Sequence, residues 1–323
     1  MLVRRQEAFG ECRLVWVTQD SARAEELRGE DAEVHLVGEW HGPFSPAVAR
    51  TVWRSLRRVL RDRPRVVVTS GSGIVVPFCL MARMAGARLV FVETSARVRG
   101  PSSSGRVLSR LADHVIAQWD DMHAVYPDAT IARSSTVEGL AAEPPGNGAG
   151  TFVAVGTHSQ PFDRLLTAVD RAAAQGVLPA PVTAQVGPSV YQMRHAEVLH
   201  FVTPQEMDAA IGRAKHVVCH AGSGTIATAL RAGRRPLVMA RLQQYGEHFD
   251  DHQQQIVDKL AALDLVVPIG DEITTADLAR AERPLRLPTE LERLPLLADA
   301  LADRVQQVLG ADGRHRLPVV ARH

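Results

Sequence analysis

The sequence predicts an α/β protein with two Rossmann-like parallel-sheet domains that face each other across a cleft. The length of 323 residues suits two domains. Short β-branched runs alternate with segments of helical length, which is typical of parallel sheets covered on both faces. A stretch rich in Pro and Gly at 141–150 is typical of a linker, so we expect domains at 1–140 and 151–323.

In the first domain, apolar runs bounded by turn residues predict strands, and two longer segments predict helices. Pro46–Leu60 and Ile74–Ala85 have helical length, and proline suits a first helical turn. The expected strands are Leu14–Thr18, Val66–Thr69, Leu89–Val92 and Val115–Ala117.

The second domain repeats this rhythm. Thr203, with Glu206 three residues later, resembles a capping box that opens a helix running to about Lys215. The expected strands are Phe152–Val155, Val182–Val186, Val217–Cys219, Leu237–Met239 and Val266–Pro268. The other expected helices are Pro161–Ala174, Thr225–Ala232, His252–Leu263 and Leu296–Leu309.

Composition excludes several classes of protein. The chain is 46% hydrophobic and 23% charged, which is ordinary for a globular protein and not for a disordered one. It has no apolar run long enough for a spanning helix and no apolar core of a secretory signal at its start. Its three cysteines are far apart, which argues against a zinc knuckle or a disulfide framework. We therefore expect a cytoplasmic protein.

Arginine is concentrated in the first domain. Residues 50–110 hold 13 Arg and only two acids, Asp62 and Glu93. Such a block favours an anionic partner, either phosphate groups, an acidic membrane surface or nucleic acid, although a solvated helix face is the alternative. Aromatic residues make up 5% of the chain and do not interleave with these arginines, so we expect no nucleic-acid partner.

The strongest local motif follows the strand at Val217–Cys219, where His220-Ala-Gly-Ser-Gly-Thr225 leads directly into a helix. Glycines allow close approach of the backbone, and free N–H groups at a helix start favour a phosphate. The hydroxyls of Ser223 and Thr225 and the imidazole of His220 add donors. The loop therefore predicts a phosphate site, the alternative being an ordinary strand-to-helix turn.

A polar segment, Arg241-Leu-Gln-Gln-Tyr-Gly-Glu-His-Phe-Asp-Asp-His-Gln-Gln254, follows the next strand. Carboxylates and carboxamides suit the hydroxyls of a ribose or a sugar. Four side chains, Glu247, His248, Asp251 and His252, also offer a metal alternative, but the HExxH glutamate is absent. We favour sugar recognition and expect no metal.

Other glycine turns follow strands. Gly156 and Thr157 are expected to face the same cleft, and Gly187 to border a flat base. In the first domain, Gly71 and Gly73 form another strand–glycine–helix segment.

Glu93 ends a strand among arginines, so it is either a structural anchor or a general base. A serine-rich turn follows it. Together with nearby arginines this turn suits a second anionic ligand, and the candidate residues are Arg97, Ser104, Gly105 and Arg106.

These residues carry a family resemblance. FVAVGTHSQPFDRLL, HVVCHAGSGTIATAL and QYGEHFDDHQQQIVDKL resemble the catalytic half of the two-subunit UDP-N-acetylglucosamine transferase of dolichol-linked oligosaccharide assembly. That half belongs to glycosyltransferase family 28, which includes the MurG lipid II synthase. The segment from RVVVTSGSGIVVPF to DDMHAVYP resembles the acceptor-side subunit, and bacterial exopolysaccharide transferases use similar pairs.

The resemblance implies a GT-B fold and an inverting glycosyltransferase that needs no metal or cofactor. It would use a UDP-sugar, with GlcNAc favoured, and a polyprenyl-diphosphate-linked sugar at the inner face of the membrane. The implied diphosphate residues are Gly222, Ser223, Gly224 and Thr225. Gln185 and Gly187 would lie near uracil. The residues near ribose or sugar would be Glu247, Asp251, His252 and Gln253.

The family's first half opens with a strand and a Gly-Gly-His loop, which the twelve residues before Arg13 do not supply. We therefore expect the first domain to lack its first strand, and Glu93 or His220 to serve as the base. Two alternatives stay open, a non-catalytic UDP-sugar-binding or scaffold protein and a UDP-sugar 2-epimerase.

Overall fold

A computed structural model describes residues 13–18, 28–29, 33–36, 46–140 and 146–310 of the chain. The chain forms two compact units. The first contains the residues up to Thr94, Arg99–Ala132 and the chain from Pro295 onward, and the second contains Ser95–Val98 and Arg133–Leu294. The expected absence of a first strand concerns residues 1–12, which lie outside the described residues.

The first unit contains a four-stranded parallel sheet in the order β3-β4-β5-β6 and a separate parallel pair, β1-β2. The strands are β1 (Val15–Thr18), β2 (Glu33–Leu36), β3 (Val66–Thr69), β4 (Arg88–Val92), β5 (His114–Ala117) and β6 (Thr130–Ile131). Between residues 46 and 130, the helices are α2 (Pro46–Asp62), η2 (Gly73–Val75), α3 (Val76–Met84), α4 (Gly105–Leu111) and η3 (Asp120–Ala124). All four strands predicted in this domain are confirmed, while β2, β6 and α4 were not predicted.

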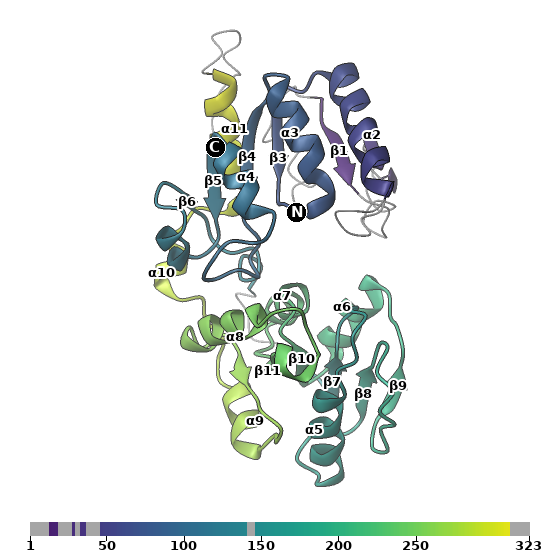
Figure 1. The fold of residues 1–323 in the computed structure, drawn as a ribbon. Coiled ribbons are helices and arrows are strands. Elements are labelled where there is room, and N and C mark those ends of the chain that lie inside the picture. Colours follow the sequence, from purple (N-terminus) through teal and green to yellow (C-terminus); the bar gives the residue numbers. More distant parts are fainter. Residues whose placement is uncertain (1–12, 19–27, 30–32, 37–45, 141–145, 311–323) are drawn as a thin grey trace. The chain divides into compact units, whose positions relative to one another are not determined.

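The last described helix, α11 (Leu297–Gly310), returns to the first unit. Its apolar side chains, such as Leu301 and Val305, pack with Val90 and Val92 of β4 and Ile116 of β5. Figure 1 shows α11 along this sheet, on the side away from α3. The sequence-based boundary had left this helix in the second domain, because apolar periodicity predicts a helix without saying which sheet it covers.

The second unit contains a six-stranded parallel sheet in the order β12-β11-β10-β7-β8-β9. The strands are β7 (Thr151–Ala154), β8 (Val182–Gln185), β9 (Glu197–Leu199), β10 (His216–His220), β11 (Leu237–Met239) and β12 (Val267–Pro268). The helices are α5 (Asp163–Ala174), α6 (Pro204–Arg213), α7 (Ser223–Arg231), η4 (Gln243–Tyr245), α8 (His252–Ala262), α9 (Thr275–Ala281) and α10 (Thr289–Glu292). The predicted capping box at Thr203 and Glu206 is confirmed.

The strand order fixes where a ligand is expected. From β7 the chain builds outward through β8 and β9, and then returns to place β10 on the other side of β7. Such a reversal leaves a crevice at the carboxyl ends of the two strands, which is where open α/β sheets bind ligands. The loops after β7 and β10 contain Gly156 and Gly222.

None of the helices within the described residues combines the length and the apolar character that crossing a bilayer requires.

Candidate functional site

The loop after β10 leads into α7 without a side-chain cap. Gly222 is the N-cap residue, and no acidic side chain lies in the first turn of the helix. The first N–H groups of an α-helix have no partner within the helix, so the amides of Ser223, Gly224 and Thr225 are available to an anion. The four residues predicted to bind diphosphate thus lie together at one helix start.

His220 lies at the end of β10, beneath this loop. Its Nδ1 is 3.3 Å from the carbonyl oxygen of Ala154, which requires the proton on Nδ1. A Cβ added to Gly222 would lie 2.1 Å from Nε2, and one added to Gly156 would lie 2.5 Å from it. Burial, together with the charge of Arg241, lowers the pKa of His220 to about 4, so the ring is neutral at pH 7.

Gly156 and Gln185 lock the ends of β7 and β8 together. The Gln185 side chain accepts from the Gly156 N–H at 3.1 Å and donates to the Gly156 carbonyl at 3.1 Å. Gly156 has φ +85°, which favours glycine. Gly187 follows β8 and donates to His200, while Thr157 is exposed beside Gly156. These four predicted residues therefore gather at the carboxyl ends of β7 and β8.

Arg241 is a buried hub that the sequence interpretation did not identify as such. Its guanidinium donates to the carbonyls of Val155, Gln160 and Pro161 at 2.9 to 3.1 Å and lies over the Phe162 ring. Burial lowers its pKa to about 10, so it remains charged at pH 7. The arginine therefore ties the loop after β7 to the loop after β11.

Three polar residues predicted to meet ribose or sugar hold their own loop in place. Glu247 is buried, pairs with Arg164 at 2.9 Å and accepts from the Leu242 N–H. Gln253 accepts from the Arg241 N–H at 3.1 Å, and Asp251 accepts from the Gln243 N–H at 2.8 Å. The residues do lie together, as predicted, and these contacts order the loop.

His252 belongs to a cluster of imidazoles. The His248 ring lies 4.9 Å from that of His158 and 4.6 Å from that of His252. Asp250 accepts from Nδ1 of His252 and ion-pairs with Arg97 at 2.7 Å. Burial lowers the pKa of both His158 and His248. Asp250 and His158 were not predicted, although the HFDDH spacing could have indicated Asp250.

Within the described residues, one group of side chains could supply three metal ligands. The candidate ligand atoms of His248, Asp250 and His252 all lie within 4.8 Å of one another. In this structure Asp250 is already neutralised by Arg97 and hydrogen-bonded to His252. That arrangement needs no metal to satisfy the carboxylate, and metal independence stays a prediction.

In the first unit, Glu93 is 1% exposed and occupied by hydrogen bonds. It accepts from the N–H groups of Thr94 and Ser102 and, at 2.9 Å, from the hydroxyl of Tyr126. Burial and the Glu93 carboxylate raise the pKa of Tyr126, which therefore stays a phenol. Glu93 thus anchors the turn that starts α4.

The acceptor candidates of the first unit come together only in part. The Ser104 hydroxyl accepts from the N–H of Ser72, the residue between Gly71 and Gly73, at 3.2 Å. Gly105 is the first residue of α4 and packs against the Glu93 carboxylate. Arg106 is exposed on α4. Arg97, by contrast, belongs to the second unit, where its guanidinium donates to the Asp250 carboxylate.

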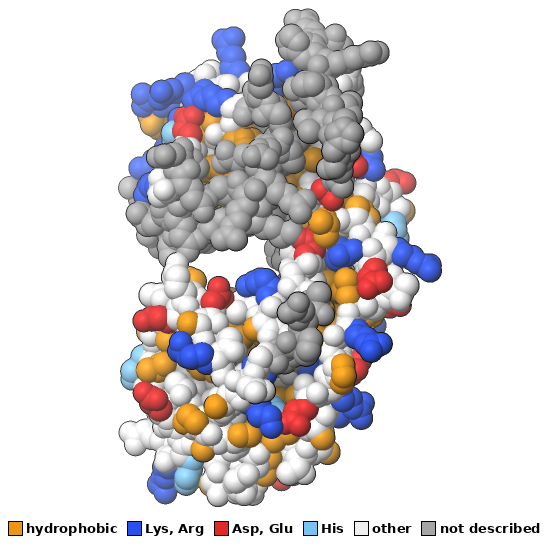
Figure 2. Space-filling model, turned by 180° about the vertical axis from the view of Figure 1, so that it is seen from behind, with side chains coloured by type: hydrophobic (Ala, Val, Ile, Leu, Met, Phe, Trp, Pro, Cys, Tyr) orange, Lys and Arg blue, Asp and Glu red, His pale blue; other side chains and the backbone are white. Residues whose placement is uncertain are grey.

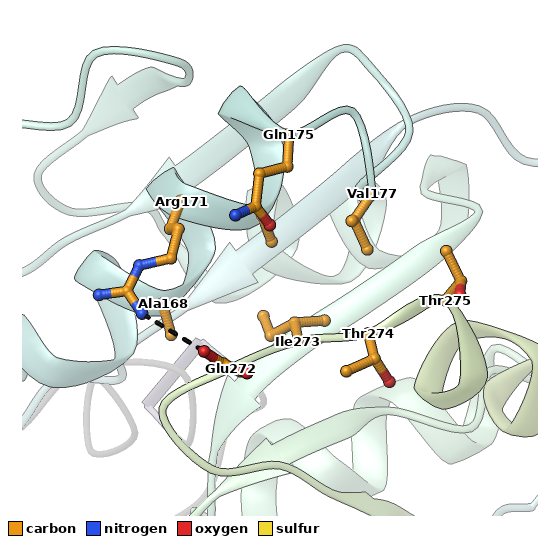
Figure 3. Close-up of a pocket in the computed structure, with 9 residues that line it drawn as sticks. Ala168, Arg171, Gln175, Val177, Glu272, Ile273, Thr274 and Thr275 are labelled. Atoms are coloured by element: carbon orange, nitrogen blue, oxygen red, sulfur yellow. Dashed lines mark ion pairs between the residues drawn. The ribbon is translucent and has the colours of Figure 1, made fainter.

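A cavity of about 290 Å³ lies elsewhere in the second unit (Figure 3). It is lined by α5 residues such as Ala168 and Ala172 and by the segment before α9, and an Arg171–Glu272 ion pair of 4.0 Å crosses its edge. None of the predicted site residues lines it, so this cavity is separate from the candidate site.

Comparison with solved structures identifies the fold. The chain superimposes on MurG from Acinetobacter baumannii with a TM-score of 0.60 at 16% identity, covering 95% of this chain and 94% of that one. The UDP-GlcNAc 2-epimerase from Methanocaldococcus jannaschii gives 0.62 at 9% identity, with 96% and 95% coverage. The fold is that of the GT-B glycosyltransferases, which confirms the predicted fold class.

Family models then identify the two parts of the chain. Residues 43–134 match the Alg14-like oligosaccharide biosynthesis proteins, and residues 151–286 match the glycosyltransferase family 28 C-terminal domain. This confirms the resemblance stated from the sequence.

Relatives of two kinds match the chain, ALG14 subunits and N-acetylglucosamine transferases named for an undecaprenol-linked substrate. The mouse UDP-N-acetylglucosamine transferase subunit ALG14 is 36% identical over 83 residues, which are 24% of this chain and 38% of that protein. The chain therefore spans well under half the length of this relative. The N-acetylmuramyl-(pentapeptide) pyrophosphoryl-undecaprenol N-acetylglucosamine transferase of Cupriavidus pinatubonensis is 29% identical over 278 residues, covering 78% of this chain and 72% of that protein.

Proposed function

We propose that this protein is an inverting glycosyltransferase that moves a hexose or N-acetylhexosamine from a UDP-sugar to a polyprenyl-diphosphate-linked sugar. GlcNAc is the favoured sugar, because the matched relatives are named for its transfer. The product would become part of a cell-surface polysaccharide, such as an exopolysaccharide, or of a glycolipid. One observation carries the proposal: an uncapped helix start with glycines lies at the switch point between β7 and β10.

The proposed donor site uses the amides of Gly222–Thr225 for the diphosphate. Gln185 and Gly187 would border uracil, with Gly156 and Thr157 beside them, and the Glu247–Gln253 loop would meet ribose or sugar. The helix start and Arg241 would stabilise the leaving diphosphate without a metal or cofactor. In the first unit, Gly71, Gly73, Ser104, Gly105 and Arg106 are the proposed acceptor residues.

A thermal-shift panel tests the donor site. UDP, UDP-GlcNAc, UDP-Gal, UDP-Glc and UDP-GlcA are compared with ADP, with and without EDTA. A ligand that binds the native state raises the Tm as its concentration increases. At ~100 times Kd it adds about 2.7 kcal/mol to the free energy of unfolding. We expect a shift with UDP that EDTA leaves unchanged. A chain that no uridine nucleotide stabilises would refute the proposal, and a shift abolished by EDTA would refute metal independence.

The epimerase alternative has one observation in its favour, the fold shared with a UDP-GlcNAc 2-epimerase. An epimerase would convert UDP-GlcNAc to its 2-epimer without any acceptor, which proton NMR of the sugar detects. A non-catalytic UDP-sugar-binding protein would show a raised Tm in the thermal-shift panel, but it would neither transfer the sugar nor epimerise it.

Glu93 and His220 remain the proposed bases, and Glu93→Gln is the first test. If Glu93 is the base, kcat with a polyprenyl-diphosphate-GlcNAc acceptor falls about 10²–10⁴-fold. The glutamine NH2 cannot accept, so at least one of the backbone N–H groups that Glu93 satisfies would lose its acceptor, and stability falls by about 1–3 kcal/mol. Tyr126→Phe is the matched control, because it removes one hydrogen-bond donor to Glu93 and keeps the carboxylate. Turnover by Glu93→Gln within about threefold of that control would assign catalysis to another group.

The proposed acceptor is a lipid, and α2 offers a surface for an anionic membrane. Trp53, Leu56 and Leu60 are 59%, 43% and 62% exposed, whereas the buried side of the helix carries Ser55 and Val59. The three apolar residues are spaced three and four apart, so they form one stripe. The Arg57 guanidinium lies 5.5 Å from the Trp53 ring centre. Apolar side chains flanked by arginines are typical of interfacial helices.

We expect the full chain to sediment with vesicles that contain phosphatidylglycerol and to bind neutral vesicles more weakly. Trp53→Ser combined with Leu60→Ser should weaken this binding at least ~10-fold, because two side chains worth about 1.5–3 kcal/mol each no longer enter the apolar region. Phe201→Ser, which changes an exposed aromatic residue of the second unit, is the control. Equal binding by the double variant and the wild type would exclude this helix as the docking surface. Docking at the inner face would make the protein a peripheral, cytoplasmic membrane protein.

A further inference from the structure

Arg97 belongs to a four-residue segment, Ser95–Val98, that is part of the second unit although the residues on either side of it are part of the first. Its guanidinium Nη2 donates to Oδ2 of Asp250 at 2.7 Å, across 153 positions of sequence. The Arg97 side chain is only 22% exposed, so this ion pair is partly shielded from water. A shielded, charge-assisted contact of this length orients both of its partners.

The other carboxylate oxygen of Asp250 contacts His252. Oδ1 accepts from Nδ1 of His252 and also from its backbone N–H at 3.4 Å. A carboxylate only accepts, so Nδ1 of His252 carries a proton and Nε2 is the nitrogen left for a ligand. Burial would raise the pKa of Asp250, but the hydrogen bonds from His252 and Arg97 outweigh it and hold that pKa well below its usual range.

His248 contacts the same aspartate. Both the backbone N–H of Asp250 and its carboxylate oxygen Oδ1 lie 3.4 Å from Nδ1 of His248. The two imidazoles therefore share one carboxylate oxygen, and His252 contacts it more closely than His248 does. Both depend on the orientation of Asp250, and Arg97 is the cation that fixes it.

We infer that Arg97 is a positioning residue of the donor site, acting through Asp250 to hold His252 with Nδ1 protonated and Nε2 free for a ribose hydroxyl of the uridine nucleotide. The inference rests on the proposed function for its ligand. It departs from the interpretation of Arg97 as an acceptor residue, because its Nη2 is already engaged by Asp250.

UDP binding by isothermal titration calorimetry tests the relay in the full chain. We expect Arg97→Ala to weaken UDP binding about 5–30-fold, in the range of one charge-assisted contact, and Arg97→Lys to restore most of it. Asp250→Asn should weaken binding similarly. Because Arg97 acts through Asp250, Arg97→Ala should cost nothing further in the Asp250→Asn background. Arg171→Ala, at an exposed arginine of the same unit, should bind UDP like the wild type.

Nitrogen-15 NMR of the histidine side chains provides a measurement without ligand. The His252 signal, assigned by its loss in His252→Gln, should show a protonated Nδ1 in the wild type and a mixture of tautomers in Arg97→Ala. Unchanged UDP affinity in Arg97→Ala, additive losses in the double variant, or an unchanged tautomer would each overturn the inference. Failure of the wild type to bind UDP would instead overturn the proposed function, and the NMR measurement would still decide the role of Arg97.

Discussion

Replacing Gly224 by alanine is expected to abolish most UDP binding while leaving the fold as stable as before or more so. A Cβ added at this position has no heavy atom within 4 Å, and the backbone there is ordinary helix. Alanine should therefore stabilise α7 by up to about 0.5–1 kcal/mol. The same methyl group would occupy the space through which a diphosphate approaches the helix start, so we expect affinity to fall at least ~30-fold.

The measurement pairs urea unfolding with calorimetric titration of UDP. Gly212→Ala is the matched control, because Gly212 lies in α6 and an added Cβ there is equally free of contacts. Both variants should be at least as stable as the wild type, and only Gly224→Ala should lose UDP affinity. A Gly224→Ala protein that binds UDP normally would show that the diphosphate does not approach this helix.

Acidification is expected to destabilise the protein by about 3 kcal/mol through His220 alone. Its pKa is about 4 in the folded chain, because of burial and of Arg241, against 6.5 for an unperturbed histidine. Between these values the unfolded chain binds a proton that the folded chain does not, so falling pH favours unfolding. The contribution is fully present above about pH 6.5 and is lost as the pH falls toward 4, and 2.5 pKa units at about 1.36 kcal/mol each give that figure.

Urea unfolding between about pH 7 and about pH 4.5 measures this slope. His220→Gln should be less stable at neutral pH and should lose less stability on acidification. Some slope should remain, since burial also lowers the pKa of His158 and His248. His123→Gln, at an exposed histidine, is the control. An equal slope in His220→Gln and the wild type would contradict the assignment.

The strands and most helices could be predicted because their signals are local. Val66–Thr69 and Val182–Gln185 are β-branched runs that end at turns, and Thr203 with Glu206 caps its own helix. β9 was missed because Glu197–Leu199 is short and exposed. The partner of α11 was missed because its core contacts are with strands some 200 positions away in the sequence.

The glycine loops of the candidate site could be predicted because a strand, a glycine turn and a helix start are consecutive in sequence. The inner contacts could not. Arg241 follows a strand and was noticed only as the start of a polar loop, but its burial under Val155 and Gln160 depends on tertiary packing. Asp250 and Asp251 are chemically identical neighbours in the sequence. Only the folded structure shows that Asp250 accepts from His252 and that Asp251 accepts from the Gln243 N–H.

The return of α11 to the first sheet makes the second unit an insertion within the first. During synthesis on the ribosome, β4 and β5 are complete long before the helix that covers Val90, Val92 and Ile116 has been translated. The nascent chain must therefore keep one apolar sheet face open, or covered by a chaperone, until almost the whole polypeptide has emerged. If the gene were cut at the linker, the first fragment would expose this apolar sheet face, and α11, which covers it, would belong to the second fragment.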